Sequence, residues 1–192
     1  MKTETPPRAV FLDRDGTLIV DRNGLIRPEE LELLPGVAEA IGRLNRHGWR
    51  TVVVTNQPVV AQGLCSEADL RRVHSELEAR LRRQQAFLDR IYFCPHAPEK
   101  AMGEGERETR IECDCRKPKP GMLLRAAREM NLDLRACWLV GDTTRDMQTA
   151  RNAGVRSILV RTGHAGQDGK FPAKPDLTAE NMLAAVALLT AG

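Results

Sequence analysis

The chain has 192 residues, of which 42% are hydrophobic and 29% are charged, a composition that suits one folded domain with a real core. The formal net charge of +3 is too small, and the aromatic content of 4% too low, for a nucleic-acid-binding surface or a stacking platform for single strands. No apolar run approaches the ~20 residues that span a bilayer, and the first residues lack the apolar stretch of a secretory leader. We therefore expect a cytoplasmic protein with no nucleic-acid and no membrane partner, whose mildly basic charge suits an anionic small molecule.

Short β-branched runs alternate with stretches of helical spacing along the chain. In chain order the predicted elements begin with a strand at 9–12, a helix at 37–47, a strand at 51–54 and a helix from 66 to about 85. They continue with a strand at 91–93, a helix at 121–130, a strand at 137–140, a helix at 144–153, a strand at 157–160 and an apolar tail helix at 178–189. This order predicts an α/β fold with a doubly wound parallel sheet, formed by a single domain over 1–192. In such sheets the ligand site lies beyond the carboxyl ends of the strands. The polar stretch 97–111 is expected to form a surface loop.

The most informative motif is Asp13-Arg14-Asp15-Gly16-Thr17, directly after the first predicted strand. Two carboxylates two residues apart at a strand end project to one side of the chain. One of them can attack phosphorus and bind Mg²⁺, while the other protonates the departing oxygen, and Gly16 permits the tight turn. The alternative is an Asp-rich surface turn, since Asp-Gly is common at turns.

The second predicted strand ends in Val54-Thr55-Asn56-Gln57, where a hydroxyl and backbone amides can bind phosphoryl oxygens. Further on, Arg116-Lys117-Pro118-Lys119 supplies cations just before a helix. Lys117 can offset the charge of a phosphoryl group. The alternative for this segment is a solvated basic loop, and that interpretation is favoured for Lys119.

The strand at 137–140 is followed by Gly141-Asp142-Thr143-Thr144-Arg145-Asp146. Asp142 lies at the strand end, where it can bind a metal. Asp146 falls on the first turn of the next helix, where an acid either serves the site or only stabilises the helix dipole. The residues leave both interpretations of Asp146 open.

Four of the residues between 94 and 115 have side chains that bind zinc: Cys94, His96, Cys113 and Cys115. Three thiolates and one imidazole match a tetrahedral structural zinc site, which would hold both ends of the loop at about 94–115. The alternative is unpaired cysteines and a surface histidine. Cys65 lies outside these pairs, and Cys137 is expected as a small core residue in a strand.

Four strand ends that carry DxDGT, TN, K and GDxxxD in this order resemble the haloacid dehalogenase (HAD) phosphohydrolase superfamily, over roughly residues 10–160. The resemblance implies Mg²⁺ and a covalent aspartyl-phosphate, with Asp13 as nucleophile and Asp15 as general acid and then base. It assigns Thr55 and Lys117 to the phosphoryl group. It implies that Mg²⁺ is bound by Asp13, Asp142 and the backbone carbonyl of Asp15.

The CPH and CDCRKPKPGM segments, together with DRDGT and TNQ, resemble one branch of this superfamily, the D-glycero-D-manno-heptose 1,7-bisphosphate phosphatases and related histidinol-phosphatase domains. The branch implies structural Zn²⁺ at the four ligands above, removal of the 7-phosphate, and no large cap domain. It places Asp21 where the family contacts substrate. We expect Asn56, Gln57 and Arg116 to contact the sugar phosphate as well.

The chain departs from this branch at two places. Pro58-Val59 and Gln62 replace a Ser-Gly pair and an arginine, and Thr143 replaces a Lys or Arg. The second phosphate therefore lacks two of its usual cations, for which Arg116, Arg161 or Lys119 could compensate. Histidinol phosphate is the alternative substrate, and a scaffold without turnover and a zinc-centred nucleic-acid module are the alternatives of other classes. A monomer is expected, because no apolar interface stripe is left over.

Overall fold

The computed structural model describes residues 7–25, 27–97 and 111–191. Their strands form one six-stranded sheet in the order β3-β2-β1-β4-β5-β6, in which every pairing is parallel. The strands are β1 (Ala9–Leu12), β2 (Arg50–Asn56), β3 (Arg90–Cys94), β4 (Trp138–Gly141), β5 (Arg156–Val160) and β6 (Leu177–Ala179). The predicted doubly wound α/β fold is therefore confirmed, since β1 pairs with β2 on one side and with β4 on the other.

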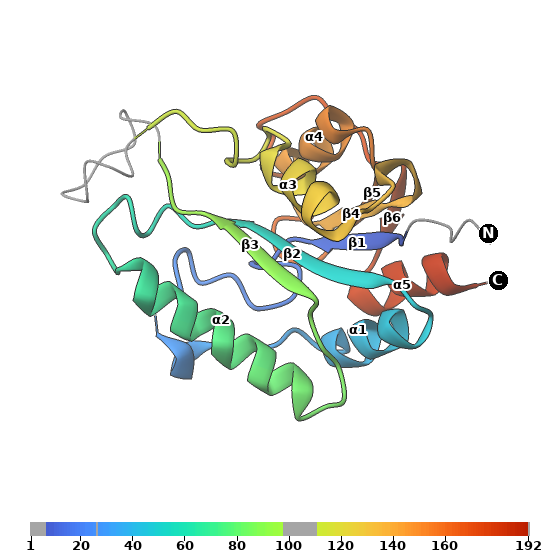
Figure 1. The fold of residues 1–192 in the computed structure, drawn as a ribbon, viewed down its shortest axis with the longest axis horizontal. Coiled ribbons are helices and arrows are strands. Elements are labelled where there is room, and N and C mark those ends of the chain that lie inside the picture. The colour runs from blue at the N-terminus through green and yellow to red at the C-terminus, as the bar shows by residue number, and fades with distance from the viewer. Residues whose placement is uncertain (1–6, 26, 98–110, 192) are drawn as a thin grey trace.

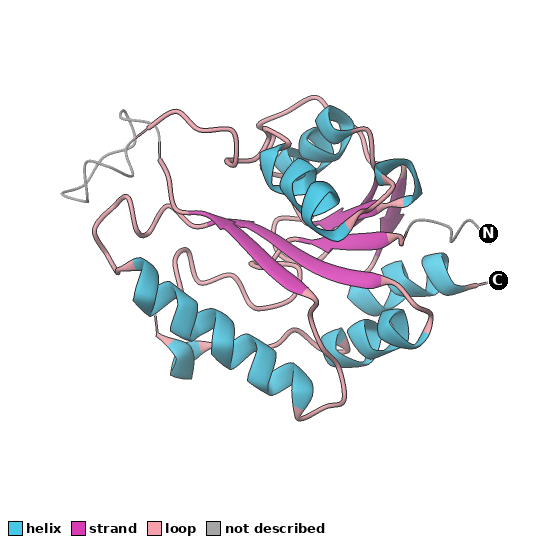
Figure 2. Cartoon of the chain, in the orientation of Figure 1, coloured by secondary structure: helices cyan, strands magenta, loops and turns pink. Residues whose placement is uncertain are grey.

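Helices cover both faces of the sheet, as the cartoon shows (Figures 1 and 2). On one face lie α1 (Val37–Arg46), α2 (Glu67–Arg82) and α5 (Met182–Thr190), and on the other lie α3 (Gly121–Met130) and α4 (Thr144–Ala153). Short 3₁₀ turns at η1 (Pro28–Glu30) and η3 (Leu134–Ala136) complete the described elements. No separate cap domain is present among the described residues.

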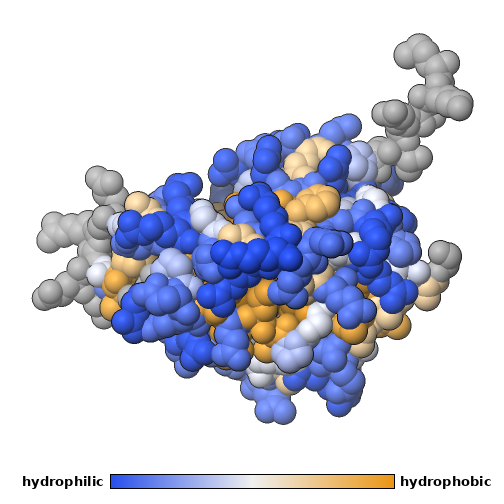
Figure 3. All heavy atoms as spheres, turned by 90° about the horizontal axis from the view of Figure 1, so that it is seen from below, coloured by the Kyte–Doolittle hydropathy of each residue, from blue (hydrophilic) through white to orange (hydrophobic). Residues whose placement is uncertain are grey.

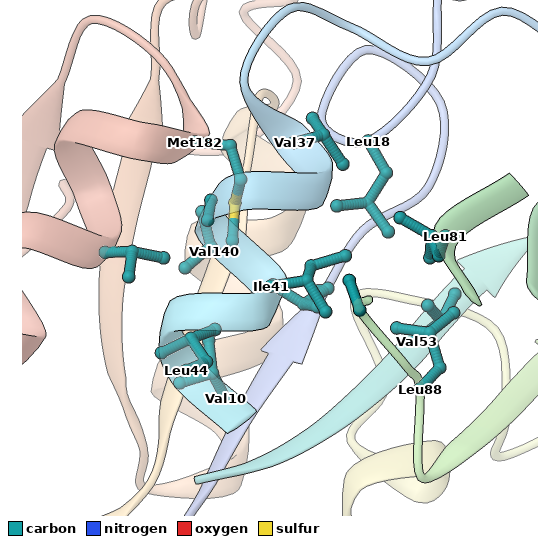
Figure 4. Close-up of a cluster of buried hydrophobic side chains, with 14 of the residues drawn as sticks. Val10, Leu18, Val37, Ile41, Leu44, Val53, Leu81, Leu88, Val140 and Met182 are labelled. Carbon is teal, nitrogen blue, oxygen red and sulfur yellow. The ribbon is translucent and has the colours of Figure 1, made fainter. Parts of the chain in front are cut away.

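The core has one large apolar cluster on each face of the sheet, and Val59, Val60 and Leu70 form a third, small one. Figure 4 shows the larger of the two large clusters, in which Leu44 of α1 lies beside Val10 of β1 and Val37 of α1 lies beside Leu18. The other large cluster packs α3 and α4 against the opposite face through residues such as Phe11, Leu123 and Leu139. Strands buried on both faces explain why β1 and β4 are continuous apolar runs rather than alternating ones.

The tail was predicted as one helix over 178–189, and that prediction is wrong at its start. Thr178 and Ala179 belong to β6, which pairs with Leu159 and Val160 of β5. The helix begins only after Asn181, whose side chain accepts a hydrogen bond from the amide of Ala184. Three residues are too short a run to show strand periodicity in the sequence, so the apolar helix that follows hides the strand.

The outer surface is mainly hydrophilic, with an apolar area near the centre of the face that Figure 3 views from below. None of the helices in the described part of the chain combines the length and hydropathy needed to cross a bilayer. The predicted surface loop at 97–111 falls almost entirely outside the described residues.

Candidate active site

The carboxyl ends of β1 and β4 bring three acidic side chains together. Asp13 follows β1, Asp142 follows β4, and Asp146 lies on the first turn of α4. All three are buried, and each offers an oxygen within 4.8 Å of an oxygen of the others. The parallel pairing of β1 with β4 causes this meeting, because it places both strand ends at the same edge of the sheet.

Lys117 lies between two of these carboxylates. Its Nζ donates to Asp13 Oδ1 at 2.8 Å and to Asp146 Oδ1 at 2.5 Å, and its side chain is 3% exposed. Burial alone disfavours the charged form, yet the carboxylates of Asp13 and Asp146 outweigh it and raise the Lys117 pKa above its usual range. Lys117 is therefore an ammonium ion that neutralises part of the acidic cluster.

One lysine does not balance three carboxylates. Burial first, and then the neighbouring Asp146 and Asp142, raise the pKa of Asp13 to about 8 against the opposing effect of Lys117. Burial likewise raises the pKa of Asp142 to about 7. Burial is the larger cause of both shifts, and the neighbouring carboxylates add negative charge that a divalent cation would compensate.

Asp142 has the geometry of a metal ligand. Its Oδ2 accepts from the amide of His164 at 2.7 Å, whereas its buried Oδ1 has no hydrogen-bond partner among the described residues. Gly16 and Gly163, both with positive φ, pack so closely on this carboxylate that a Cβ at either position would overlap Oδ2. An orphaned buried oxygen in a cluster of oxygen ligands fits Mg²⁺, which prefers such ligands.

Asp15 points away from this cluster into a second network. Arg14 holds both of its oxygens, with Nε donating to Oδ2 at 3.1 Å and Nη2 donating to Oδ1 at 3.0 Å. Gln57 Nε2 also donates to Asp15 Oδ2 at 2.7 Å, and to Thr55 Oγ1 at 2.9 Å. The structure thus places the two aspartates of the motif in different surroundings, one against a lysine and one against an arginine.

Asn56 and Gln57 at the end of β2 bind protein groups in this structure. Asn56 Oδ1 accepts from the amide of Lys117 at 2.9 Å, and Asn56 Nδ2 donates to the Lys117 carbonyl at 3.1 Å. These two bonds fix the backbone of Lys117 beside β2. Thr55 at the same strand end is 1% exposed, and its hydroxyl accepts from Gln57 Nε2.

Asp146 both contacts the acidic site and stabilises the start of α4, the two interpretations that the sequence left open. Its Oδ1 accepts from Lys117, while its Oδ2 accepts from the amide of Thr143 at 3.2 Å and from the Thr143 hydroxyl. Thr143 caps α4 in a capping box with Asp146. The threonine that departs from the family pattern therefore orients an acid of the site.

The four zinc-ligand candidates are brought together beside this site. Distances between their ligand atoms are 3.5 Å for Cys94–Cys113, 3.4 Å for Cys113–Cys115, 3.2 Å for His96–Cys115 and 3.7 Å for Cys94–His96. A tetrahedral ion with Zn–S bonds of about 2.3 Å needs ligand separations of about 3.5–3.8 Å. Among the described residues all five cysteines are free thiols, so the cluster fits zinc rather than a disulfide.

The other candidate residues lie outside the acidic cluster. Asp21 lines a hollow with Gly16 and Gly163, and its carboxylate lies 3.4 Å from His164 Nε2. Arg116 is partly buried and donates through Nη1 to the carbonyl of His96 at 2.8 Å. Of the other two compensating cations that the sequence suggested, exposed Lys119 pairs with Glu112 and exposed Arg161 with Glu180.

Two residues of the site were not assigned a role from the sequence. Arg14 was the unassigned middle residue of the motif, and His74, whose Nε2 lies 3.1 Å from Arg14 Nη1, was not singled out. The position of His74 in its helix could have indicated that it is buried. It lies at helical spacing from Leu70 and Leu77 on the buried face of α2, where a histidine needs a polar partner.

Comparisons with known proteins agree with this geometry. A model of hydrolases described as "HAD-hyrolase-like" matches residues 114–185. D-glycero-beta-D-manno-heptose-1,7-bisphosphate 7-phosphatases from Escherichia coli K12 and Photorhabdus laumondii are 42% and 40% identical over 156 residues, which cover 81% of this chain and 80% and 81% of theirs.

Solved structures give the same result. The D,D-heptose 1,7-bisphosphate phosphatase of B. bronchiseptica, complexed with magnesium and phosphate, superimposes with a TM-score of 0.81 at 34% identity, covering 95% of this chain and 97% of that one. A putative HAD-like phosphatase from Mesorhizobium loti has a TM-score of 0.79 at 35% identity, covering 96% and 88%.

Proposed function

The chain belongs to the HAD hydrolases, in the branch of the heptose-1,7-bisphosphate 7-phosphatases, and we propose that it hydrolyses the 7-phosphate of D-glycero-D-manno-heptose 1,7-bisphosphate with the help of Mg²⁺. The observation that carries this proposal is the buried cluster of Asp13, Asp142 and Asp146 around Lys117, with one orphaned carboxylate oxygen. The similarity to phosphatases of this specificity over about four-fifths of the chain supports the substrate.

Asp13 and Asp15 divide the chemistry between them in this proposal. A carboxylate oxygen of Asp13 attacks phosphorus, the P–O bond to the sugar breaks, and the departing oxygen takes a proton from Asp15. Asp15 then accepts a proton from water, whose oxygen attacks the phosphorus of the aspartyl-phosphate and releases inorganic phosphate. Asp13 lies inside the buried cluster, whereas the Asp15 side chain is 20% exposed, so the outer acid can meet the leaving group.

The remaining residues of the site bind charge. Lys117 and the Thr55 hydroxyl would hold the phosphoryl oxygens, as preorganised donors do for developing negative charge. Asp13, Asp142 and the backbone carbonyl of Asp15 would hold Mg²⁺. When bound, the ion neutralises the repulsion between the attacking carboxylate and the phosphate dianion. Asp146 keeps Lys117 in place.

The part of the substrate beyond the reacting phosphate would lie at the rim. Asp21 lines a hollow next to Gly16 and would accept hydrogen bonds from sugar hydroxyls. Arg116 adjoins Lys117 in the sequence and would supply positive charge to a second phosphate. In this proposal Asn56 and Gln57 serve the substrate through Lys117 and Asp15, whose positions they fix.

We also propose structural zinc at Cys94, His96, Cys113 and Cys115 in one HAD domain over 1–192. Zinc there would hold the chain immediately before Lys117, so that the loop at about 94–115 supports the site without taking part in the chemistry. Ligand thiols stay reduced in the cytoplasm, which is the compartment we propose. We also propose that the protein is a monomer with a sugar phosphate as its partner.

Phosphate release with Mg²⁺ tests the function. The substrate panel contains both anomers of heptose 1,7-bisphosphate, histidinol phosphate and fructose 1,6-bisphosphate. Preference for a heptose anomer is the expected result. Equal turnover of all four compounds, or turnover confined to another ester, would refute the substrate while leaving the phosphatase chemistry, and no turnover of any ester would refute both.

A further inference from the structure

Arg14 is the largest fully buried side chain in the described part of the molecule. A buried guanidinium costs several kcal/mol of desolvation unless its donors are paired. Its pairing with Asp15 is a fork, in which two nitrogens meet both carboxylate oxygens. Such a fork fixes the plane of a carboxylate, which a single point charge such as lysine does not.

His74 supplies the remaining contact of this guanidinium. Its Nε2 lies 3.1 Å from Arg14 Nη1. Because arginine has no acceptor, the imidazole nitrogen must accept, so the ring is neutral and carries its proton on Nδ1. Burial, and then the charges of Arg14 and Arg71, lower the pKa of His74 to about 3, in agreement with a neutral ring.

The ring of His74 is itself held in place. It packs on the Phe93 ring of β3 at 5.4 Å between centroids and an interplanar angle of 57°. It also stands on the buried face of α2, one turn from Leu77. A chain of fixed groups thus leads from α2 and β3 through a buried arginine to a partly exposed aspartate.

We infer that Arg14 and His74 form a positioning pair for Asp15, in which His74 fixes the guanidinium and the guanidinium aims the carboxyl group at the leaving oxygen. This inference rests on the proposed phosphatase function. Neither residue contacts the substrate, so both act through Asp15. A catalytic group has to be held within about 0.5 Å and 10–20° of its productive geometry. Gln57 binds only one oxygen of this carboxylate, which is one-fifth exposed, whereas Arg14 binds both.

The test compares two esters whose leaving groups differ in their need for a proton. A sugar phosphate releases a strongly basic alkoxide that depends on Asp15, whereas 4-nitrophenyl phosphate releases a weakly basic phenolate that does not. The measured quantity is kcat/KM, which reports the steps up to release of the leaving group. His74→Met removes the acceptor but keeps the volume, and His74→Gln keeps an acceptor oxygen.

We expect His74→Met to lower kcat/KM for the sugar phosphate by about 10- to 100-fold, the scale of a small misplacement of a catalytic group. The loss for 4-nitrophenyl phosphate should be much smaller, and His74→Gln should recover most of the activity on the sugar phosphate. Leu77→Ala is the matched control on the same face of α2, since it lowers stability and removes no hydrogen-bond partner of Arg14. It should leave the ratio of the two kcat/KM values unchanged.

Equal losses on both esters, or the same change of ratio in Leu77→Ala, would show that His74 is only structural and would overturn the inference. Wild-type protein that hydrolyses both esters, with His74→Met indistinguishable from it, would also overturn the inference but leave the proposed function intact. Wild-type protein that hydrolyses neither ester would refute the proposed function and the inference together.

Discussion

Lys117 donates a 2.8 Å hydrogen bond to Asp13 across 104 residues of sequence, and the Asn56 side chain holds the backbone of the same lysine through two further bonds. The lysine therefore has both its main chain and its side chain fixed. A charged group held in this way costs little reorganisation when negative charge develops on a bound phosphate.

Replacing Lys117 by methionine should lower kcat by about 10²–10³-fold, the effect of removing one preorganised donor for developing charge. Without the ammonium, three carboxylates also repel one another, so the melting temperature in a chelating buffer should fall and Mg²⁺ should partly restore it. Steady-state kinetics and thermal melts with and without Mg²⁺ check both effects. Lys170→Met, an exposed lysine, is the control, and a loss of equal size there would contradict the assignment.

Asp13→Asn should lower turnover by about 10⁴-fold or more, because the amide cannot act as the nucleophile. The amide oxygen can still accept from Lys117, so the fold should stay intact by circular dichroism. Mass spectrometry of quenched wild-type enzyme should show a phosphorylated species that the variant lacks. Near-normal turnover in the variant would rule out the covalent route.

The order of strands and helices could be predicted because each is a local pattern. Apolar runs bounded by Gly and Pro mark β1, β2 and β4. The acidic cluster could also be foreseen, since parallel strands bring Asp13 and Asp142 to one edge. β6 was missed because three residues are too few to show the two-residue periodicity of a strand, and their strand conformation depends on pairing with β5.

The hydrogen bonds between residues of the site could not be derived from the spacing of motifs in the sequence. Asn56 was expected to contact the substrate because its type and place allow it, but its two hydrogen bonds to the Lys117 backbone could not be foreseen from the sequence. The link between Arg14 and His74 joins positions 60 apart, and only the packing of α2 against the sheet determines it. The contribution of Thr143 likewise depends on Asp146, because Thr143 binds one oxygen of Asp146 while Lys117 binds the other.

Cys113→Ser should lower the melting temperature and the bound zinc more than it lowers kcat. The ligand cluster lies just before Lys117 but contributes no atom to the acidic cluster. Elemental analysis and thermal melts measure the two quantities, and Cys65→Ser, outside the ligand set, is the control. An unchanged melting temperature with no zinc in the wild-type protein would remove the structural-zinc proposal.

Thr143→Ala should destabilise the protein by about 1 kcal/mol, the usual value of an N-cap side chain. It should also reduce kcat, because Asp146 loses a hydrogen bond that orients it toward Lys117. Thr143→Ser retains the hydroxyl and should restore both. If the serine variant is no better than the alanine variant in urea unfolding and kinetics, the hydroxyl is not the feature that matters.

The stability of the protein should depend on pH through His74. Its pKa is about 3 in the folded protein, against an ordinary value of 6.5 in the unfolded chain, so the unfolded chain binds a proton that the folded chain does not. The stability that this group confers is fully present above its unfolded pKa and is lost as pH falls toward the folded one. The slope between these limits approaches about 1.4 kcal/mol per pH unit.

Urea unfolding of wild-type protein and His74→Gln at about pH 7, 6 and 5 isolates this contribution. The carboxylates of the acidic cluster titrate in both proteins, so the difference between the two curves reports His74 alone. The wild-type curve should fall more steeply below pH 6.5. Leu77→Ala has no titratable replacement and should run parallel to wild type. Parallel curves for His74→Gln as well would mean that the buried ring accepts a proton as readily as it does in the unfolded chain, against its contact with the Arg14 guanidinium.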